Sequence, residues 1–395
     1  MRWVCCRGCC TRRRGSRWSP ASESGRFVQF VRVSHPLCTR CCLGWGPEEA
    51  VVSAFPVVRL EAPGDDRNPS SPGSAGRAGE ESARKRWPGG TGACALSEFI
   101  EARFEVLDER FSGVGGDGLV ERLHSGCRWT EGPVYFAAGR YLLFSDIPND
   151  RLLRWDETTG VVGVFRAPAG YTNGHTVDRQ GRLVSCEQGH RRVTRTEHDG
   201  SVVVLADRWN GKRLNSPNDV VERADGSVWF TDPSYGIDSD YEGHRAETEI
   251  GACHVYRVDP ATGDVRAVAQ DFDRPNGLAF SADERRLYVA DTRRKHIRLF
   301  DVADDGALSG GEVFATCDAG SFDGVRLDAL GRVWAAAHDG VHCFDADGTP
   351  LGKLLLPEVV SNLVFGGPKR NHLFMTASSS VYALRVNFNG VAYPR

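Results

Sequence analysis

A unit of short strands and tight turns recurs through the chain from about residue 131 onward. Each unit opens with a polar residue beside Gly or Pro, runs into a short apolar strand, and reaches a second strand through a turn such as Asp328–Arg332. An amphipathic third strand and an Asp-x-x-x-Gly turn follow, as in Asp259–Gly263. Unit openings fall near Glu131, Asn173, Asn218, Asn276, Asp323 and Asn362. Six units spaced by roughly 40 to 60 residues have the period of four-stranded propeller blades, which predicts an all-β, six-bladed β-propeller.

The propeller is expected to occupy residues 98–395. Strand-like runs at 102–107 or 119–123 would close the ring by pairing with the last blade, which removes an exposed sheet edge. Apolar residues at helical spacing are nearly confined to Leu96–Phe104. The longest unit contains an insertion at Ser234–Glu249, and such loops usually decorate one face of a propeller and help to shape a pocket there.

Residues 1–97 have a different composition, rich in Arg, Cys, Gly, Ser and Pro and without strand or helix periodicity. We expect this extension to be disordered, because it has too little apolar surface to form a core. It also has the composition of a translated upstream region that is not part of the native protein. Cys6-x2-Cys9 and Cys38-x2-Cys41 have the spacing of a four-thiolate zinc site, but no hydrophobic frame separates the two pairs.

Charge and cysteine usage narrow the class of protein. The extension carries 15 Lys+Arg and 8 Asp+Glu, so its net charge of +7 leaves −10 for the remainder of a chain whose total is −3. An acidic body argues against a nucleic-acid-binding face. Cysteines scattered singly after residue 97 are typical of core residues in a reducing compartment. Neither a transmembrane run nor a signal peptide is recognisable, so we expect a cytoplasmic protein without a membrane partner. Its oligomeric state stays open.

Four unit openings carry oxygen-bearing side chains that suit a metal ion. The innermost strand of a propeller blade runs along the central channel, so residues at the starts of these strands surround one mouth of it. Glu131, Asn218, Asn276 and Asp323 hold this position in different units. Two carboxylates and two amides favour a hard cation such as calcium, whereas zinc or copper prefers His or Cys. Asn-Gly and Asp-Gly pairs also form ordinary turns, but Glu131 beside Gly-Pro has no such role.

The sequence from about 127 to 386 resembles the gluconolactonase, regucalcin and senescence-marker-protein superfamily of six-bladed propellers. Two elements are similar to those of bacterial gluconolactonases in particular: Thr231-Asp232-Pro233-Ser234-Tyr235-Gly236 and Cys186-Glu187-Gln188-Gly189-His190-Arg191-Arg192. The other matching segments are Glu131-Gly132-Pro133, Ser145-Asp146-Ile147-Pro148-Asn149, Asn173-Gly174-His175, Ser216-Pro217-Asn218-Asp219, Pro275-Asn276-Gly277 and Asp323-Gly324.

The resemblance implies that Glu131, Asn276 and Asp323 bind the metal directly, and that Asn218 is a further ligand or a substrate contact. Calcium is the default ion, with Zn²⁺, Mg²⁺ and Mn²⁺ as alternatives. The family hydrolyses lactones, chiefly sugar lactones, which makes a small lactone such as gluconolactone the expected partner. Two alternatives stay open: hydrolysis of another ester or an organophosphate at the same site, and a non-catalytic ligand-binding propeller.

Lactone opening needs a cation near the carbonyl oxygen and a base that takes a proton from water. Asp323 is the first candidate for the base and His175 the second. Asn173, Asn218, Asp232 and Tyr235 are expected to contact substrate hydroxyl groups. The sequence has no nucleophile elbow, no His-Glu-x-x-His and no nucleotide fingerprint, so a covalent serine mechanism or a nucleotide cofactor is unsupported.

Overall fold

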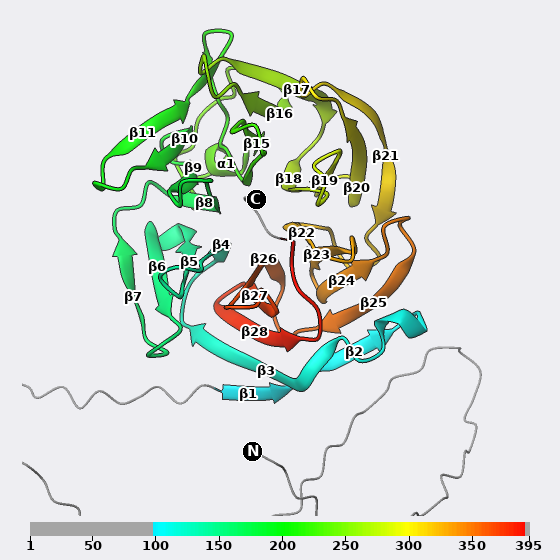
Figure 1. The fold of residues 1–395 in the computed structure, drawn as a ribbon. Helices are drawn as coiled ribbons and strands as arrows, with labels where there is room; N and C mark the ends of the chain where they lie inside the picture. Colours follow the sequence, from blue (N-terminus) through cyan, green and yellow to red (C-terminus); the bar gives the residue numbers. More distant parts are fainter. Residues whose placement is uncertain (1–97, 392–395) are drawn as a thin grey trace, which may run out of the picture. The chain divides into compact units, whose positions relative to one another are not determined.

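The computed structural model describes residues 98–391, so the expectations of disorder and of a zinc site in residues 1–97 concern a segment outside it. The described strands form six antiparallel sheets around a channel (Figure 1), and a separate hairpin pairs β12 (Arg208–Trp209) with β13 (Lys212–Arg213). The predicted all-β, six-bladed propeller is therefore confirmed.

The blades follow the sequence order around the ring, and the first strand of each lies nearest the channel. Blade 1 contains β4 (Thr130–Phe136), β5 (Tyr141–Asp146), β6 (Arg151–Asp156) and β7 (Val162–Arg166). Blade 2 contains β8 (Thr172–Val177), β9 (Leu183–Glu187), β10 (Arg192–Thr196) and β11 (Val202–Ala206). Blade 3 contains β14 (Val220–Glu222), β15 (Val228–Asp232), β16 (Cys253–Val258) and β17 (Val265–Phe272).

Blades 4 to 6 repeat this pattern, with added strands in the last two. Blade 4 contains β18 (Pro275–Phe280), β19 (Arg286–Asp291), β20 (His296–Val302) and β21 (Leu308–Thr316). Blade 5 contains β22 (Val325–Leu327), β23 (Val333–Ala337), β24 (Gly340–Phe344) and β25 (Pro350–Leu355), with β2 (Arg103–Val106) as a fifth strand. Blade 6 contains β26 (Val360–Gly366), β27 (His372–Ala377), β28 (Ser380–Val386), β3 (Gly115–Ser125) and β1 (Glu98–Glu101).

The ring is closed by β3, which pairs with β28 of the last blade. This confirms the expectation for 119–123, whereas the run at 102–107 contributes β2 to the edge of blade 5 by pairing with β25. The helical spacing at Leu96–Phe104 was misleading, because its described part forms β1 and β2. Alternating apolar residues on a short segment satisfy either periodicity, and pairing with an open sheet edge decides the outcome.

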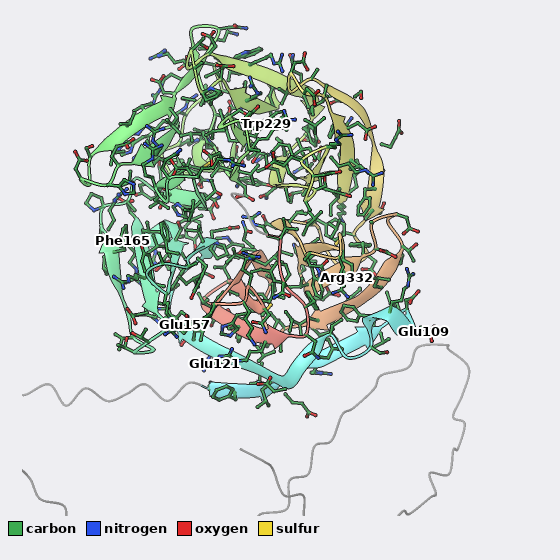
Figure 2. All side chains as sticks on the ribbon, in the orientation of Figure 1. Glu109, Glu121, Glu157, Phe165, Trp229 and Arg332 are labelled. Atoms are coloured by element: carbon green, nitrogen blue, oxygen red, sulfur yellow. The ribbon has the colours of Figure 1, made fainter. Side chains whose placement is uncertain are left out.

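The hydrophobic core lies between neighbouring blades. Six buried clusters form, one at each interface between consecutive sheets. Trp229 of blade 3 (labelled in Figure 2), for example, is fully buried. It packs edge-on against Phe280 of blade 4, with ring centroids 5.3 Å apart. Of the five cysteines in the described part, four are buried and all are unpaired, as the expectation of small core residues requires.

The predicted insertion at Ser234–Glu249 connects β15 to β16 and contains the short helix α1 (Tyr235–Asp238). Figure 1 shows α1 close to the channel. The remaining helical turns are η1 (Glu109–Phe111) and η2 (Ile147–Asn149). Within residues 98–391, none of the helices is long and apolar enough to span a membrane.

Candidate metal centre and active site

All six predicted unit openings lie at or just before the start of an innermost strand. Glu131, Asn173 and Asn276 are second residues of β4, β8 and β18, and Asn362 is the third residue of β26. Asn218 and Asp323 each precede their strand, β14 and β22, by two residues. The side chains of Glu131, Asn218 and Asn276 are at most 4% exposed, whereas Asp323 is partly exposed. One mouth of the channel therefore carries a ring of buried oxygen-bearing groups.

Close packing of the innermost strands explains the glycines beside these residues. The Gly277 amide donates to the Asp323 carbonyl (3.1 Å), and a Cβ on Gly277 would lie 2.4 Å from that oxygen. A Cβ on Gly132 would lie 1.8 Å from the Asn173 carbonyl oxygen. Side chains are excluded at both points because the neighbouring backbone occupies the space. The Asn-Gly and Asp-Gly pairs are thus strand contacts, and the turn interpretation does not apply to them.

Three oxygens in the ring lack a partner. Asn173 Oδ1, Asn276 Oδ1 and Asp323 Oδ1 are buried without a hydrogen bond to any group within residues 98–391. The Asn276 amide orientation is fixed, since its Nδ2 donates to Thr292 Oγ1 (3.0 Å), which in turn donates to the Phe322 carbonyl (2.8 Å). Buried acceptors are costly unless something donates to them or coordinates them. The donor set fits a divalent cation with oxygen preference.

The electrostatics of the ring also favour a bound cation. Burial raises the pKa of Glu131 to about 8, with a further contribution from Asp219 and Glu242 that hydrogen bonds from Gly132 and Asn362 partly offset. Burial and the Glu131 carboxylate hold the pKa of Asp323 well above its usual range. Carboxylates gathered without a compensating cation repel one another, so a bound divalent ion would lower both pKa values.

Two acidic residues near the ring, Asp219 and Glu242, were given no role by sequence reasoning. Asp219 is buried and paired with Arg326, whose Nη1 lies 3.0 Å from Asp219 Oδ2. Glu242 comes from the insertion, where burial and Asp238 raise its pKa to about 7. Its position is fixed by its neighbour Gly243, because a Cβ there would lie 2.2 Å from the Gly236 carbonyl oxygen of α1. Only the folded insertion places Glu242 near the ring, so no local pattern could have revealed it.

A buried aspartate at the end of the second strand holds the loop before the ligand position in three blades. Asp146 accepts from the amides of Arg128 (2.9 Å) and Trp129 (3.5 Å), which precede Glu131. We call these aspartates, Asp146, Asp232 and Asp291, the loop clamps.

The same contact recurs in blades 3 and 4, where the donating amides again lie three and two residues before the predicted ligand. Asp232 accepts from the Asn215 and Ser216 amides, both at 2.8 Å, ahead of Asn218. Asp291 accepts from the Asp273 (2.9 Å) and Arg274 (3.1 Å) amides, ahead of Asn276. Both oxygens of Asp232 are thereby occupied and its side chain is fully buried, so its contacts favour loop positioning over the predicted substrate contact.

His175, the second candidate base, lies between blades with both ring nitrogens occupied. Nε2 is 2.9 Å from Ser145 Oγ and Nδ1 is 2.8 Å from Ser185 Oγ. Burial lowers the pKa of His175 to about 3. Its contacts are those of a neutral structural histidine, and Asp323 is the stronger candidate for the base.

Tyr235 of α1 reaches the ring from the insertion. Burial and the nearby Asp323 carboxylate raise the pKa of Tyr235, whose hydroxyl also contacts Thr292 and Asn276. The hydroxyl is therefore protonated at neutral pH beside two predicted ligands. Asn173 and Asn218 lie at or just before the starts of innermost strands and Tyr235 lies on α1, and their contact with substrate stays a prediction.

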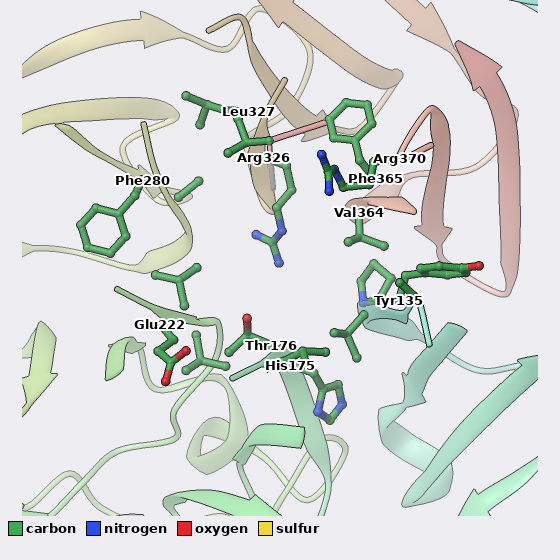
Figure 3. Close-up of a pocket in the computed structure, with 18 of the residues that line it drawn as sticks. Tyr135, His175, Thr176, Glu222, Phe280, Arg326, Leu327, Val364, Phe365 and Arg370 are labelled. Atoms are coloured by element: carbon green, nitrogen blue, oxygen red, sulfur yellow. The ribbon is translucent and has the colours of Figure 1, made fainter. Parts of the chain in front are cut away.

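Two other features belong to different parts of the propeller. A cavity of about 220 Å³ lies along the second halves of the innermost strands, and Figure 3 shows Arg326 reaching into it from β22. Asp318, Asp339 and His342 form a second acidic cluster, in blade 5. There Lys353 Nζ already lies 2.7 Å from Asp318 and 3.2 Å from Asp339, so an internal cation offsets part of the charge of the two carboxylates.

Comparisons with known proteins identify relatives over most of the described region. A family model described as the SMP-30/Gluconolactonase/LRE-like region matches residues 129–379. A gluconolactonase of Zymomonas mobilis is 32% identical over 299 residues, covering 69% of this chain and 82% of that protein. A pentonolactonase of Haloferax volcanii is 32% identical over 263 residues, covering 64% and 82%. The structure of a gluconolactonase from Xanthomonas campestris matches with a TM-score of 0.70 at 37% identity, covering 73% of this chain and 97% of that one.

Proposed function

The chain belongs to the SMP-30/gluconolactonase/LRE-like family, and we propose that it is a divalent-metal-dependent hydrolase that opens sugar lactones. Two relatives, named a gluconolactonase and a pentonolactonase, are 32% identical to it over most of their length. These names support a sugar lactone as the substrate. The single observation that carries the metal dependence is the set of buried, unpartnered oxygens at the channel mouth.

The cation would be held by Glu131, Asn218, Asn276 and Asp323. Two carboxylates and two amide oxygens match calcium, which takes six to eight oxygen ligands and leaves positions for water and substrate. Magnesium, manganese and zinc are the alternatives to compare. When bound, the ion supplies positive charge that stabilises the oxyanion formed as water adds to the lactone carbonyl.

Asp323 is the proposed general base. Its Oδ1 lies at the channel mouth without a hydrogen bond to the described residues, so it is available to accept a proton from the attacking water. The tetrahedral intermediate then collapses, the bond from the carbonyl carbon to the ring oxygen breaks, and that oxygen takes up the proton that Asp323 accepted from water. The Tyr235 hydroxyl, which remains protonated, would donate a hydrogen bond during this step. Asn173 and Asn218 would orient substrate hydroxyl groups.

The proposal is tested by following acid release from δ-gluconolactone with the full chain, after subtraction of the spontaneous rate. We expect EDTA to remove the activity and calcium or another divalent ion to restore it. Asp323→Ala should lower kcat by roughly 100-fold or more because a positioned base is lost. Metal binding without turnover of gluconolactone or pentonolactones would leave the metal centre in place but redirect the substrate assignment to another ester or an organophosphate. Activity that is insensitive to EDTA in a metal-free preparation would overturn the proposal.

A further inference from the structure

A basic cleft lies directly beside the candidate metal centre. It has a volume of about 460 Å³, and its walls include Tyr235 and Asp238 of α1, Arg274, His338, and Thr292, Arg293 and Lys295 from the turn between β19 and β20. We call it the basic cleft.

The basic cleft and the metal centre share wall residues. Thr292 lines the cleft, and its Oγ1 accepts from the Asn276 amide (3.0 Å) and donates to the carbonyl of the residue before Asp323 (2.8 Å). Tyr235 also lines the cleft while its hydroxyl contacts Asn276 and Thr292. A substrate whose carbonyl lies at the metal centre can therefore extend its far end into the cleft.

The cleft is lined mainly by positive charges, although the remainder of the chain after residue 97 is acidic. Its walls carry Arg274, Arg293 and Lys295, in a chain whose residues after 97 have a net charge of −10. Asp238 pairs with Arg274, with Nη1 and Oδ2 2.7 Å apart. Arg293 and Lys295 are exposed, and among residues 98–391 no carboxylate forms an ion pair with either. Two free cations thus face a cleft that opens next to the proposed reaction centre.

Blade 5 has no loop clamp at the end of its second strand. In blade 5, the last residue of the second strand, where blades 1, 3 and 4 have a loop clamp, is Ala337. The next residue, His338, is exposed, packs against Gly320 and lies 3.4 Å from Ser321 Oγ. Among residues 98–391, no carboxylate of blade 5 lines the cleft, so Asp238 is the one carboxylate beside the three cationic side chains of its walls.

We propose that the basic cleft binds a negatively charged group at the end of the lactone remote from the reacting carbonyl. This inference rests on the proposed function and narrows it to acidic sugar lactones bearing a phosphate, sulfonate or second carboxylate. Arg293 and Lys295 act as specificity-determining residues. Attraction between these two partly solvated cations and the anionic group discriminates charged substrates from neutral ones.

The test compares kcat/KM for 6-phosphoglucono-δ-lactone, glucarolactone and neutral δ-gluconolactone. The wild-type full chain should prefer at least one charged lactone, and the two charged substrates distinguish phosphate from carboxylate recognition. In Arg293→Gln/Lys295→Gln, the ratio of charged to neutral kcat/KM should fall roughly fivefold or more, as expected for the loss of two exposed charge contacts. Raising the salt concentration should reduce the preference in the wild type.

Arg294→Gln is the matched control. It removes the same charge from the same turn, but the Arg294 guanidinium donates to the Asp271 carbonyl (2.6 Å) and does not line the cleft. Its contact with the loop clamp Asp291 (3.7 Å) bears on the metal centre that charged and neutral lactones share, so the control is scored by the ratio alone. This variant should retain the wild-type ratio. Binding of 6-phosphogluconate and gluconate, measured by calorimetry with calcium present, gives a second readout that does not depend on turnover.

The measurements distinguish failure of this inference from failure of the proposed function. One outcome would overturn the inference while leaving the proposed function intact. In it, neutral lactones are opened efficiently, charged lactones are not preferred, and the double variant has the same ratio of charged to neutral kcat/KM. Absence of hydrolysis for every lactone would overturn the proposed function. Tighter binding of 6-phosphogluconate than of gluconate, lost in the double variant, would still support the cleft in that case.

Discussion

Glu131 is buried in a setting that favours its protonated form unless a cation is present. Its folded-state pKa is raised from 4.5 to about 8 by burial. In the metal-free protein the stability contribution of this group is fully present below pH 4.5 and is lost as the pH rises toward about 8. The Glu131 carboxylate therefore destabilises the metal-free fold at neutral and alkaline pH, and binding of the proposed cation would reverse this penalty.

Glu131→Gln should separate the effect of the carboxylate on the stability of the metal-free fold from its effect on metal binding. A Gln oxygen can still accept from the Gly132 amide (2.7 Å) and from Asn362 (3.2 Å), but it carries no charge. In EDTA at pH 8 the variant should be more stable than the wild type by on the order of 4 kcal/mol, and the difference should vanish below pH 4.5. Its calcium affinity should fall by roughly 100-fold, more than the loss of an outer-shell contact usually costs. Urea unfolding at both pH values and calorimetry measure these changes.

His175 allows a test between a structural and a catalytic role. Because burial lowers its pKa to about 3, His175 stays neutral throughout the working pH range. His175→Ala leaves the Ser145 and Ser185 hydroxyls without this partner, so it should destabilise the fold by about 1–3 kcal/mol. The pH dependence of kcat/KM between pH 5 and 8 should keep its shape. Disappearance of a limb of that profile would instead identify His175 as the base.

At the scale of strands and loops, the loop clamps hold the backbone that precedes the predicted ligands Glu131, Asn218 and Asn276. Asp291→Asn replaces an acceptor with an amide that cannot accept from both the Asp273 and Arg274 amides. We expect calcium affinity to fall about 10-fold, as for other groups that orient metal ligands.

Asp328→Asn is the matched control for the clamp. Asp328 is also fully buried and accepts from two backbone amides, those of Leu330 and Arg332, but it lies after β22, away from the strand start that carries Asp323. This variant should lose stability while calcium affinity stays near that of the wild type. Equal losses of affinity in both variants would show that the clamp has no specific effect on the metal centre.

The sequence predicted the elements better than their long-range contacts. The openings at Glu131, Asn276 and Asp323 were recognisable because a polar residue, a glycine and an apolar run repeat locally. The clamp role of Asp232 was not, since it depends on contacts across 16 or 17 residues with loop amides. Glu242 was missed for a similar reason: only the packing of Gly243 on α1 brings it near the ring.

At the scale of the whole molecule, one strand from the start of the domain closes the ring. Val120 of β3 is 1% exposed and pairs with Leu384 of β28, within the cluster between blades 5 and 6. Val120→Asp should lower the free energy of unfolding by about 4 kcal/mol because it buries an unpaired charge. Val164→Asp in β7 is the control, since Val164 is 60% exposed and should tolerate the change. Thermal unfolding compares the two, and equal stability would argue against closure by β3.

The central claim is that a single cation binds among Glu131, Asn218, Asn276 and Asp323. Crystals of the full chain grown with manganese, with anomalous diffraction data collected near the manganese edge, locate the ion directly. We predict one strong anomalous peak at the channel mouth, within coordination distance of these four side chains, and its loss in Asp323→Ala. A peak only at Asp318, Asp339 and His342, or none on the channel axis in crystals that retain activity, would contradict the account.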